Sequence, residues 1–146
     1  MKFARKSRKT RMGALPPRYS FALNPYADVR FTTCPGCEAK TRVRKIPLVV
    51  HIDGHGLLIL RKTCRLCVSC DLLLVHQDEI EPLIARSADR EATAPPEYLI
   101  LGTAEQQAWR RGLSGGVTMD DLVQHMSDFK AYMQVGYTPG GWSRSA

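Results

Sequence analysis

All five cysteines of this 146-residue chain lie between positions 34 and 70. They form two groups, the tetrapeptide CPGC, which begins at Cys34, and the heptapeptide CRLCVSC, which begins at Cys64. A CxxC turn places two thiolates on one side of a tight loop, and two such turns face to face supply a tetrahedral sulfur cage. Because the number of cysteines is odd and no apolar signal stretch is present, a disulfide framework is not expected. The spacing therefore predicts a metal site.

The second group offers two overlapping CxxC choices, which differ in the residue that follows the second cysteine. Asp71 follows Cys70 and tolerates the left-handed backbone conformation that suits this position. Val68 follows Cys67 and is β-branched, so it is poorly suited to that conformation. The predicted ligands are therefore Cys34, Cys37, Cys67 and Cys70, with Cys64 as the alternative ligand.

The predicted cofactor is one structural Zn²⁺ ion. Four thiolates suit zinc, and a chain with a modest core gains folding energy from such a metal. Iron in a rubredoxin-like site would use the same four ligands. An iron–sulfur cluster fits less well, because the spacing matches neither common ferredoxin pattern. A redox CxxC would be expected between a strand and a helix, which the sequence does not indicate here.

The two CxxC turns, with strand-like segments between them, resemble the zinc-ribbon family. The resemblance covers about residues 31–76, and CPGC is typical of the first knuckle in that family. It implies a small zinc-pinned antiparallel ribbon. It also implies, by analogy with ribosomal proteins and transcription factors that carry zinc ribbons, a role in nucleic-acid machinery.

The hydrophobic pattern predicts strands around the cysteines and helices after them. The predicted strands are 28–33, 40–52, 57–63, 71–76 and 98–101, with a hairpin turn at Asp53-Gly54. Helices are predicted over 79–90, from Thr103 to about Arg111, and from Thr118 to before Gly136. The last helix would carry an apolar stripe formed by Leu122, Met126, Phe129 and Met133.

These elements predict an α+β fold: a small four-stranded antiparallel zinc ribbon with a basic N-terminal arm and a short C-terminal helical element. The predicted parts are a basic, largely extended arm at 1–30, the zinc ribbon at 31–76, a short helix and linker at 77–97, and a C-terminal helical module at 98–146.

The net charge of +7 is unevenly distributed along the chain. Residues 1–66 carry fifteen Lys and Arg against three acidic residues, whereas residues 67–146 carry six against eleven. A cationic half of this kind favours a polyanionic partner. The predicted nucleic-acid-binding residues are Lys2, Arg5, Lys6, Arg8, Lys9, Arg11, Lys40, Arg42, Arg44, Lys45, Arg61 and Lys62, and the hairpin is expected to gather Lys40 and those that follow it into one patch.

The sequence thus predicts a non-enzymatic zinc-binding module that associates with nucleic acid or a ribonucleoprotein. The alternative hypothesis is a protein-interaction adaptor that uses acidic C-terminal helices. No nucleophile–base set, phosphate-cradling glycine loop or HExxH motif is present. His76, Asp78 and Glu79 are interpreted as a solvated polar stretch rather than a second metal centre. The expected location is cytoplasmic and not in a membrane, with organellar targeting by the basic arm as an open alternative.

Overall fold

A computed structural model describes residues 12–88, 96–106, 119–138 and 141–145 of the chain. The strands are β1 (Ser20–Asn24), β2 (Arg42–Ile52), β3 (Gly56–Cys67), β4 (Leu72–His76), β5 (Tyr98–Ala104), β6 (Met126–Asp128), β7 (Ala131–Thr138) and β8 (Gly141–Ser145). The helices are α1 (Gln77–Ala88) and α3 (Met119–Gln124).

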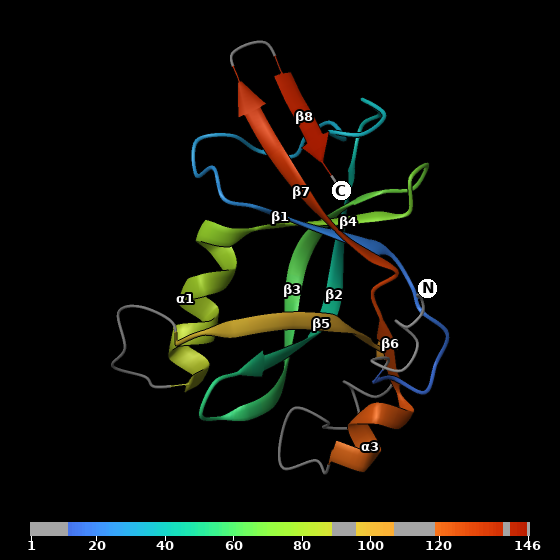
Figure 1. The fold of residues 1–146 in the computed structure, drawn as a ribbon, viewed down its shortest axis with the longest axis vertical. Helices are drawn as coiled ribbons and strands as arrows, with labels where there is room; N and C mark the ends of the chain where they lie inside the picture. The colour runs from blue at the N-terminus through green and yellow to red at the C-terminus, as the bar shows by residue number, and fades with distance from the viewer. Residues whose placement is uncertain (1–11, 89–95, 107–118, 139–140, 146) are drawn as a thin grey trace.

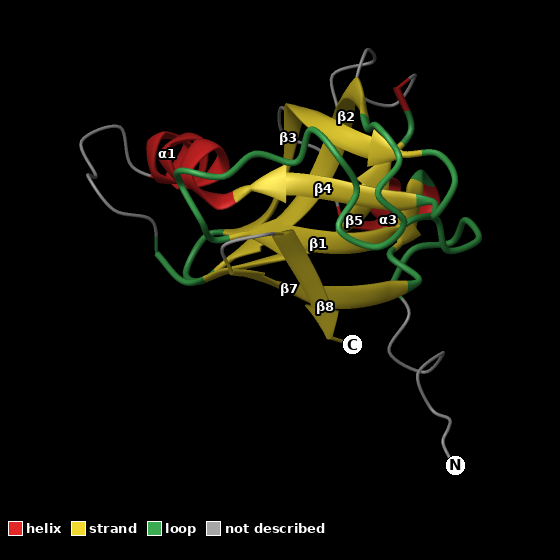
Figure 2. Cartoon of the chain, turned by 90° about the horizontal axis from the view of Figure 1, so that it is seen from above, coloured by secondary structure: helices red, strands yellow, loops and turns green. Residues whose placement is uncertain are grey.

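The strands form one mixed sheet in the order β6-β5-β2-β3-β4-β1-β7-β8. β2, β3 and β4 are an antiparallel meander, whereas β1 runs parallel to both of its neighbours, β4 and β7. The sheet curls into a half-barrel, which brings β1 close to β5 although these two strands do not pair (Figures 1 and 2). Helix α1 follows β4 directly and packs on the concave side (Figure 1).

The long β2–β3 hairpin is the centre of the sheet, and its turn is the one predicted from the sequence. Ile52 pairs with Gly56 at the last position of the hairpin, and the chain reverses through Asp53-Gly54. Gly54 and Gly56 have φ values of +83° and +87°, which a residue with a side chain adopts only with strain. The local sequence therefore determines the position of the turn and, with it, the pairing of the two strands.

Alternation of side chains along β2 and β3 separates two hydrophobic clusters. Leu48 and Val50 of β2 lie in the concave core with Ile80 and Ile84 of α1. Val49 points to the opposite side of the sheet, where it packs with Ile59 of β3 and Met126 of β6. A third cluster around Phe31 lies beside the cysteines. Both faces of the hairpin are thus covered, which explains its near-continuous apolar sequence.

The prediction of a small four-stranded zinc ribbon was wrong, because the cysteine-bearing hairpin is part of a larger sheet. β2, β3 and β4 lie where strands were predicted, but segment 28–33 forms no strand. Asn24 instead turns the chain there: its side-chain amide donates to the Val29 carbonyl, and its oxygen accepts the Tyr26 N–H. The second neighbour of β4, opposite β3, is β1, from the segment predicted to be an arm.

The predicted C-terminal helical element was also wrong in most of its length. α3 ends at Gln124, and β6, β7 and β8 follow it. The apolar residues expected on one helical stripe serve three clusters: Leu122 and Met126 pack against Val49, Phe129 stacks on Phe21 with ring centroids 4.6 Å apart, and Met133 packs near the cysteines. A single helix face could not reach all three.

The helix predicted from Thr103 was likewise wrong at its start, because Thr103 and Ala104 belong to β5. Residues 107–111 of that prediction lie outside the described residues. Within the described ranges, neither helix has the length and apolar character that crossing a membrane requires.

Candidate metal centre

Four cysteines come together at one end of the hairpin. Cys34 and Cys37 lie in the loop between β1 and β2, and Cys67 and Cys70 lie at the turn from β3 to β4. Their four Sγ atoms all lie within 4.8 Å of one another, which is close enough to hold a metal ion. This cluster contains the four predicted ligands, and among the described residues it is the one such group found.

The sulfur separations are those of metal ligands rather than of disulfides. Cys37 Sγ lies 3.5 Å from Cys67 Sγ, and Cys34 Sγ lies 3.9 Å from Cys70 Sγ. A disulfide would bring two sulfurs to about 2.05 Å. A tetrahedral site with Zn–S bonds of about 2.3 Å has sulfur–sulfur edges of about 3.8 Å. The donor set and its spacing therefore fit one tetrahedral ion.

Both CxxC turns close with a residue in the left-handed region. Asp71, after Cys70, has φ +54°, as the sequence predicted, and Glu38, after Cys37, has φ +66°. In the first turn the Gly36 N–H donates to Cys34 Sγ at 3.3 Å, and the Glu38 N–H donates to the Cys34 carbonyl at 2.9 Å. Both turns thus end on a residue with positive φ, and in the first turn a backbone N–H points at sulfur.

The cysteines of the cluster differ in exposure and in pKa. Cys37 is exposed, and a hydrogen bond with the Ala39 backbone, followed by its contact with Cys67, lowers the pKa of Cys37 to about 7. Burial raises the pKa of Cys67. Cys34 and Cys67 are fully enclosed by the cluster around Phe31, Leu72 and Leu74. The site thus has a buried side that orients two ligands and an exposed side through which an ion can enter.

Cys64 lies outside the cluster, and the geometry of β3 explains why. Cys64 and Cys67 are three residues apart on one strand, so their side chains point to opposite faces of the sheet. Cys64 lies in the concave core and donates to the Lys62 carbonyl at 3.3 Å. Burial raises the pKa of this thiol to about 12, so it stays protonated. The choice of Cys67 and Cys70 as the second pair agrees with this arrangement.

The predicted nucleic-acid-binding residues fall into three groups: six lie outside the described residues, five are exposed, and one, Lys62, is buried. Lys2, Arg5, Lys6, Arg8, Lys9 and Arg11 lie outside the described residues. Lys40, Arg42, Arg44, Lys45 and Arg61 are exposed. The hairpin distributes the last four over both faces of the sheet: Arg42 and Arg44 share the face of Ile46, whereas Lys45 and Arg61 share the face of Val49 and Ile59.

Lys62 was predicted to contact nucleic acid, but it is buried. Its side chain is 8% exposed, and its Nζ donates to Glu79 Oε1 at 2.7 Å and to the Thr63 carbonyl at 2.6 Å. Lys62 shares the concave face with Cys64 and Ile46, so its stem is covered by the core and its charge is neutralised by α1. The residue therefore holds α1 against β3.

The polar residues at the end of β4 and the start of α1 belong to the same ion network; Asp78 and Glu79 are exposed, as predicted, whereas His76 is buried. Buried His76 accepts the Phe31 N–H on Nε2 at 3.1 Å. Asp78 receives two hydrogen bonds from Arg30, at 2.7 and 2.9 Å, and this contact lowers the pKa of Asp78. The hydrogen bond from Lys62 likewise lowers the pKa of Glu79. These contacts fasten the loop that carries the first CxxC turn to the start of α1.

This network was missed in the sequence because its partners are distant along the chain and each resembles an ordinary surface charge. The one signal that could have found it is the acidic pair at the first turn of α1, because two adjacent carboxylates attract cations from other elements. Comparisons with known proteins add no further guide: no family model, no curated protein and no solved structure matches the chain. The resemblance to zinc ribbons therefore stays a prediction.

Proposed function

We propose that this protein binds one structural zinc ion through Cys34, Cys37, Cys67 and Cys70, and uses the basic strand segment beside the ion to bind nucleic acid without catalysing a reaction. The observation that carries the proposal is the position of the exposed cations. Lys40, Arg42, Arg44 and Lys45 begin within a few residues of Cys37, at the end of the hairpin where the four sulfurs meet.

The choice of zinc rests on the donor set. Four thiolates in a tetrahedral arrangement are typical of structural zinc sites, and all four tetrahedral positions would be filled by protein. A closed site of this kind leaves no position for a reacting water molecule. Zinc would supply cross-linking of the β1–β2 loop to the β3–β4 turn, and this chain's own residues would supply everything else.

The nucleic-acid role rests on charge. Lys40 pairs across the loop with Thr33, directly beside the first CxxC turn. The backbone of Arg44 pairs with that of Cys64 on β3. Pairing with β3 therefore fixes the extended backbone that carries the Arg44 guanidinium. Cations presented on a rigid strand contact phosphates with little further loss of backbone freedom, and no base-reading group is required.

Salt-dependent binding tests this role. Fluorescence anisotropy of the zinc-loaded protein with a labelled single-stranded RNA and with a DNA duplex should show affinity that falls steeply between 50 and 200 mM salt. Arg44→Gln should weaken binding and reduce the slope of log affinity against log salt by about 0.7–0.9, the effect of one lost phosphate contact. Arg86→Gln, which removes an exposed cation at the end of α1, is the matched control.

Two results would contradict the nucleic-acid role. One is the absence of binding to either probe at 50 mM salt. The other is an equal loss of affinity in Arg44→Gln and Arg86→Gln. Equal losses would mean that binding responds to the net charge of the protein and not to cations at a particular site. The adaptor alternative stays a prediction; of the described C-terminal part, which it took to be acidic helices, α3 is one such helix and the rest is mainly strands.

A further inference from the structure

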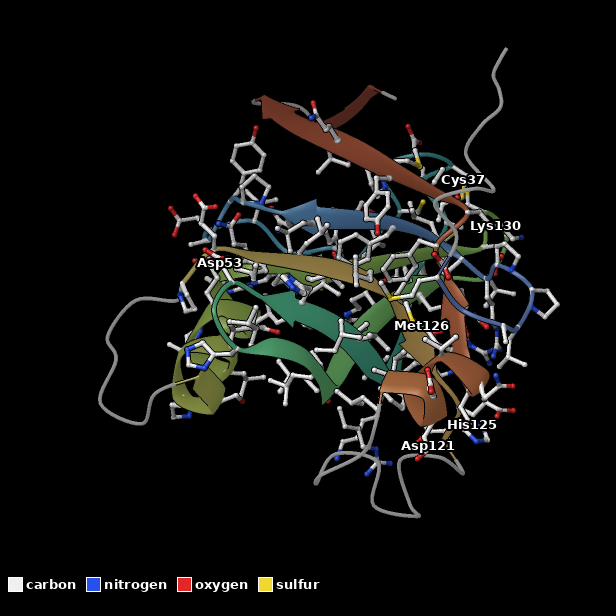
Figure 3. The ribbon with its side chains drawn as sticks, turned by 60° about the horizontal axis from the view of Figure 1, so that its bottom comes forward. Cys37, Asp53, Asp121, His125, Met126 and Lys130 are labelled. Carbon is white, nitrogen blue, oxygen red and sulfur yellow. The ribbon has the colours of Figure 1, made fainter. Side chains whose placement is uncertain are left out.

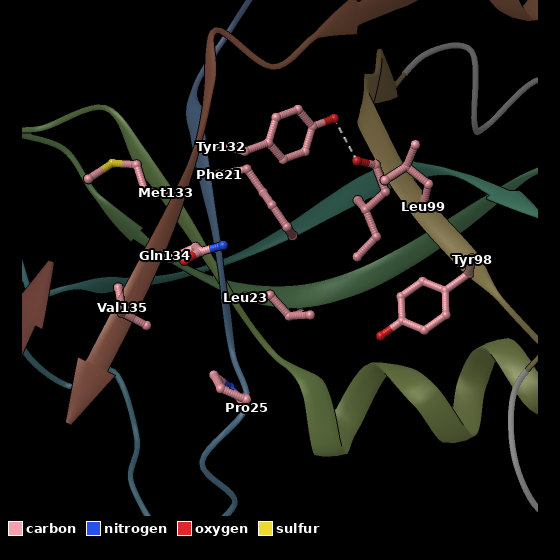
Figure 4. Close-up of a pocket in the computed structure, with 10 residues that line it drawn as sticks. Phe21, Leu23, Pro25, Tyr98, Leu99, Tyr132, Met133, Gln134 and Val135 are labelled. Carbon is pink, nitrogen blue, oxygen red and sulfur yellow. Dashed lines mark hydrogen bonds between the residues drawn. The ribbon is translucent and has the colours of Figure 1, made fainter. Parts of the chain in front are cut away.

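A large apolar groove lies at the open seam of the half-barrel, between β5 on one side and β1 and β7 on the other (Figure 4). Its volume is about 510 Å³, within the range of about 300–1,000 Å³ that is usual for binding sites. Apart from Gln134, its lining residues are apolar or aromatic, among them Leu23, Tyr98, Leu99 and Tyr132. None of the metal ligands or exposed cations described above lines it.

The backbone edge of β5 faces this groove. β2 pairs with β5 from Tyr98 to Thr103, but on its other side β5 pairs with β6 only from Gly102 to Ala104. Within the described residues, no strand covers this outer edge from Tyr98 to Ile100. An unpaired edge is a template on which a further strand can form.

The hydrogen bonds show which backbone groups point outward. The Glu97 carbonyl accepts the Asp53 N–H beyond the end of β2, so Glu97 and, by alternation, Leu99 direct their backbone groups toward β2. Tyr98 and Ile100 therefore direct theirs toward the groove. The Tyr132 hydroxyl confirms this direction, because it donates to the Ile100 carbonyl at 2.8 Å across the groove (Figure 4).

The apolar side chains and carboxylates at the groove determine which kind of ligand it can bind. Leu99 is 56% exposed and Tyr132 is 51% exposed, so large apolar surface borders the unpaired edge. At the Tyr98 end, the tyrosine hydroxyl donates to Glu81 at 2.7 Å, and exposed Glu97 precedes Tyr98 in the chain. The groove thus combines a strand edge, an apolar lining and an acidic end.

We propose that this groove binds an extended apolar segment of a partner protein, which adds as a strand to the outer edge of β5 and places a basic residue beside Glu81 and Glu97. The backbone of the segment pairs with Tyr98 and with Ile100, where it takes the place of the Tyr132 hydroxyl on the Ile100 carbonyl. Every second side chain of the segment enters the groove between Leu23 and Tyr98, because side chains of a strand alternate in direction.

Selection from a displayed library of random 12-residue peptides, followed by anisotropy with the enriched peptides, tests this proposal on the zinc-loaded protein. We expect enriched peptides with apolar residues at alternate positions and Lys or Arg at one end. Leu99→Lys should weaken their binding at least tenfold, because it removes apolar contact and repels the basic end. Val43→Lys is the matched control, since Val43 is also 56% exposed on a strand but does not line the groove.

Backbone methylation separates strand addition from apolar adhesion. Methyl groups on the peptide amides that face β5 should abolish binding, whereas methyl groups on the intervening amides should leave it unchanged. The proposal is overturned if no peptide is enriched, if Leu99→Lys binds as well as the unaltered protein, or if both sets of methylated peptides bind equally. A concentration-dependent dimer in sedimentation that Leu99→Lys abolishes would assign the groove to a second copy and would also overturn it.

Discussion

Removing the metal should destabilise the protein by an amount that follows from the positions of its ligands. The site joins Cys37 to Cys67, which are 30 residues apart in the chain. A cross-link that closes a loop of this length removes about 12 cal/mol/K of entropy from the unfolded chain, or about 3.6 kcal/mol at 25 °C. For a chain of this size, the loss corresponds to a decrease of about 7–14 °C in the unfolding midpoint temperature.

The assay is urea unfolding of the zinc-loaded protein and of the same protein after exhaustive chelation, followed by circular dichroism. Cys70→Ser should lose most of the difference between the two conditions, because it removes one of the four sulfurs. Cys64→Ala is the matched control: it removes a buried thiol outside the cluster. This control should be less stable in both conditions, but the difference due to zinc should stay at about 3.6 kcal/mol.

The reasoning would be refuted by a zinc-dependent difference below about 1 kcal/mol, which is too small for a cross-link of this span. It would equally be refuted if Cys64→Ala abolished the difference and Cys70→Ser did not, because Cys64 would then be a ligand.

Three further predictions concern the fold that holds the site. Glu79→Gln should lower the free energy of unfolding by about 1–2 kcal/mol, less than the 3–5 kcal/mol of a fully buried pair because Glu79 is 43% exposed; urea unfolding that shows no loss would mean that Lys62 is held by the core alone. Burial lowers the pKa of His76, so stability should be complete above pH of about 6.5 and should fall as the pH drops through the lowered pKa; unfolding midpoints at pH 5–8 should show a weaker dependence in His76→Gln, and an unchanged dependence would contradict this. Gly13→Ala should cost about 1–3 kcal/mol, because a Cβ at this position would lie 2.2 Å from the Met126 carbonyl oxygen; thermal unfolding at an unchanged temperature would show that the chain before β1 is not held against β6.

The features that sequence reasoning predicted correctly are those determined by local conformation. The hairpin turn follows from Asp53-Gly54, because glycine adopts the positive φ that the turn requires. The second CxxC turn follows from Asp71, which adopts the left-handed conformation that Val68 would resist. Both predictions used residues within a few positions of the feature.

The features that it missed depend on partners far along the chain. β1 is a strand because Ser20–Asn24 pairs with β4 and β7, and nothing within the segment itself specifies those partners. The spacing of Leu122, Met126 and Phe129 fits a helix, yet pairing of β6 with β5 and stacking of Phe129 on Phe21 outweigh that preference. Propensity is a weak guide where tertiary packing can satisfy the same residues in another conformation.

Lys62 illustrates the same limit at a single residue. In a basic run it resembles a surface cation, and only the pairing of β3 with β2 shows that it faces the core. The acid that neutralises it, Glu79, belongs to a helix that follows another strand. A prediction of binding residues from charge alone therefore includes cations that the fold uses for itself.

The central claim is tested most directly by X-ray absorption spectroscopy at the zinc edge on the protein purified with one equivalent of zinc. We expect a single shell of four sulfur atoms at about 2.3 Å, with no nitrogen or oxygen ligand. The same spectrum should appear in Cys64→Ala. A first shell that contains nitrogen or oxygen, or fewer than four sulfurs, would contradict a closed site formed by Cys34, Cys37, Cys67 and Cys70.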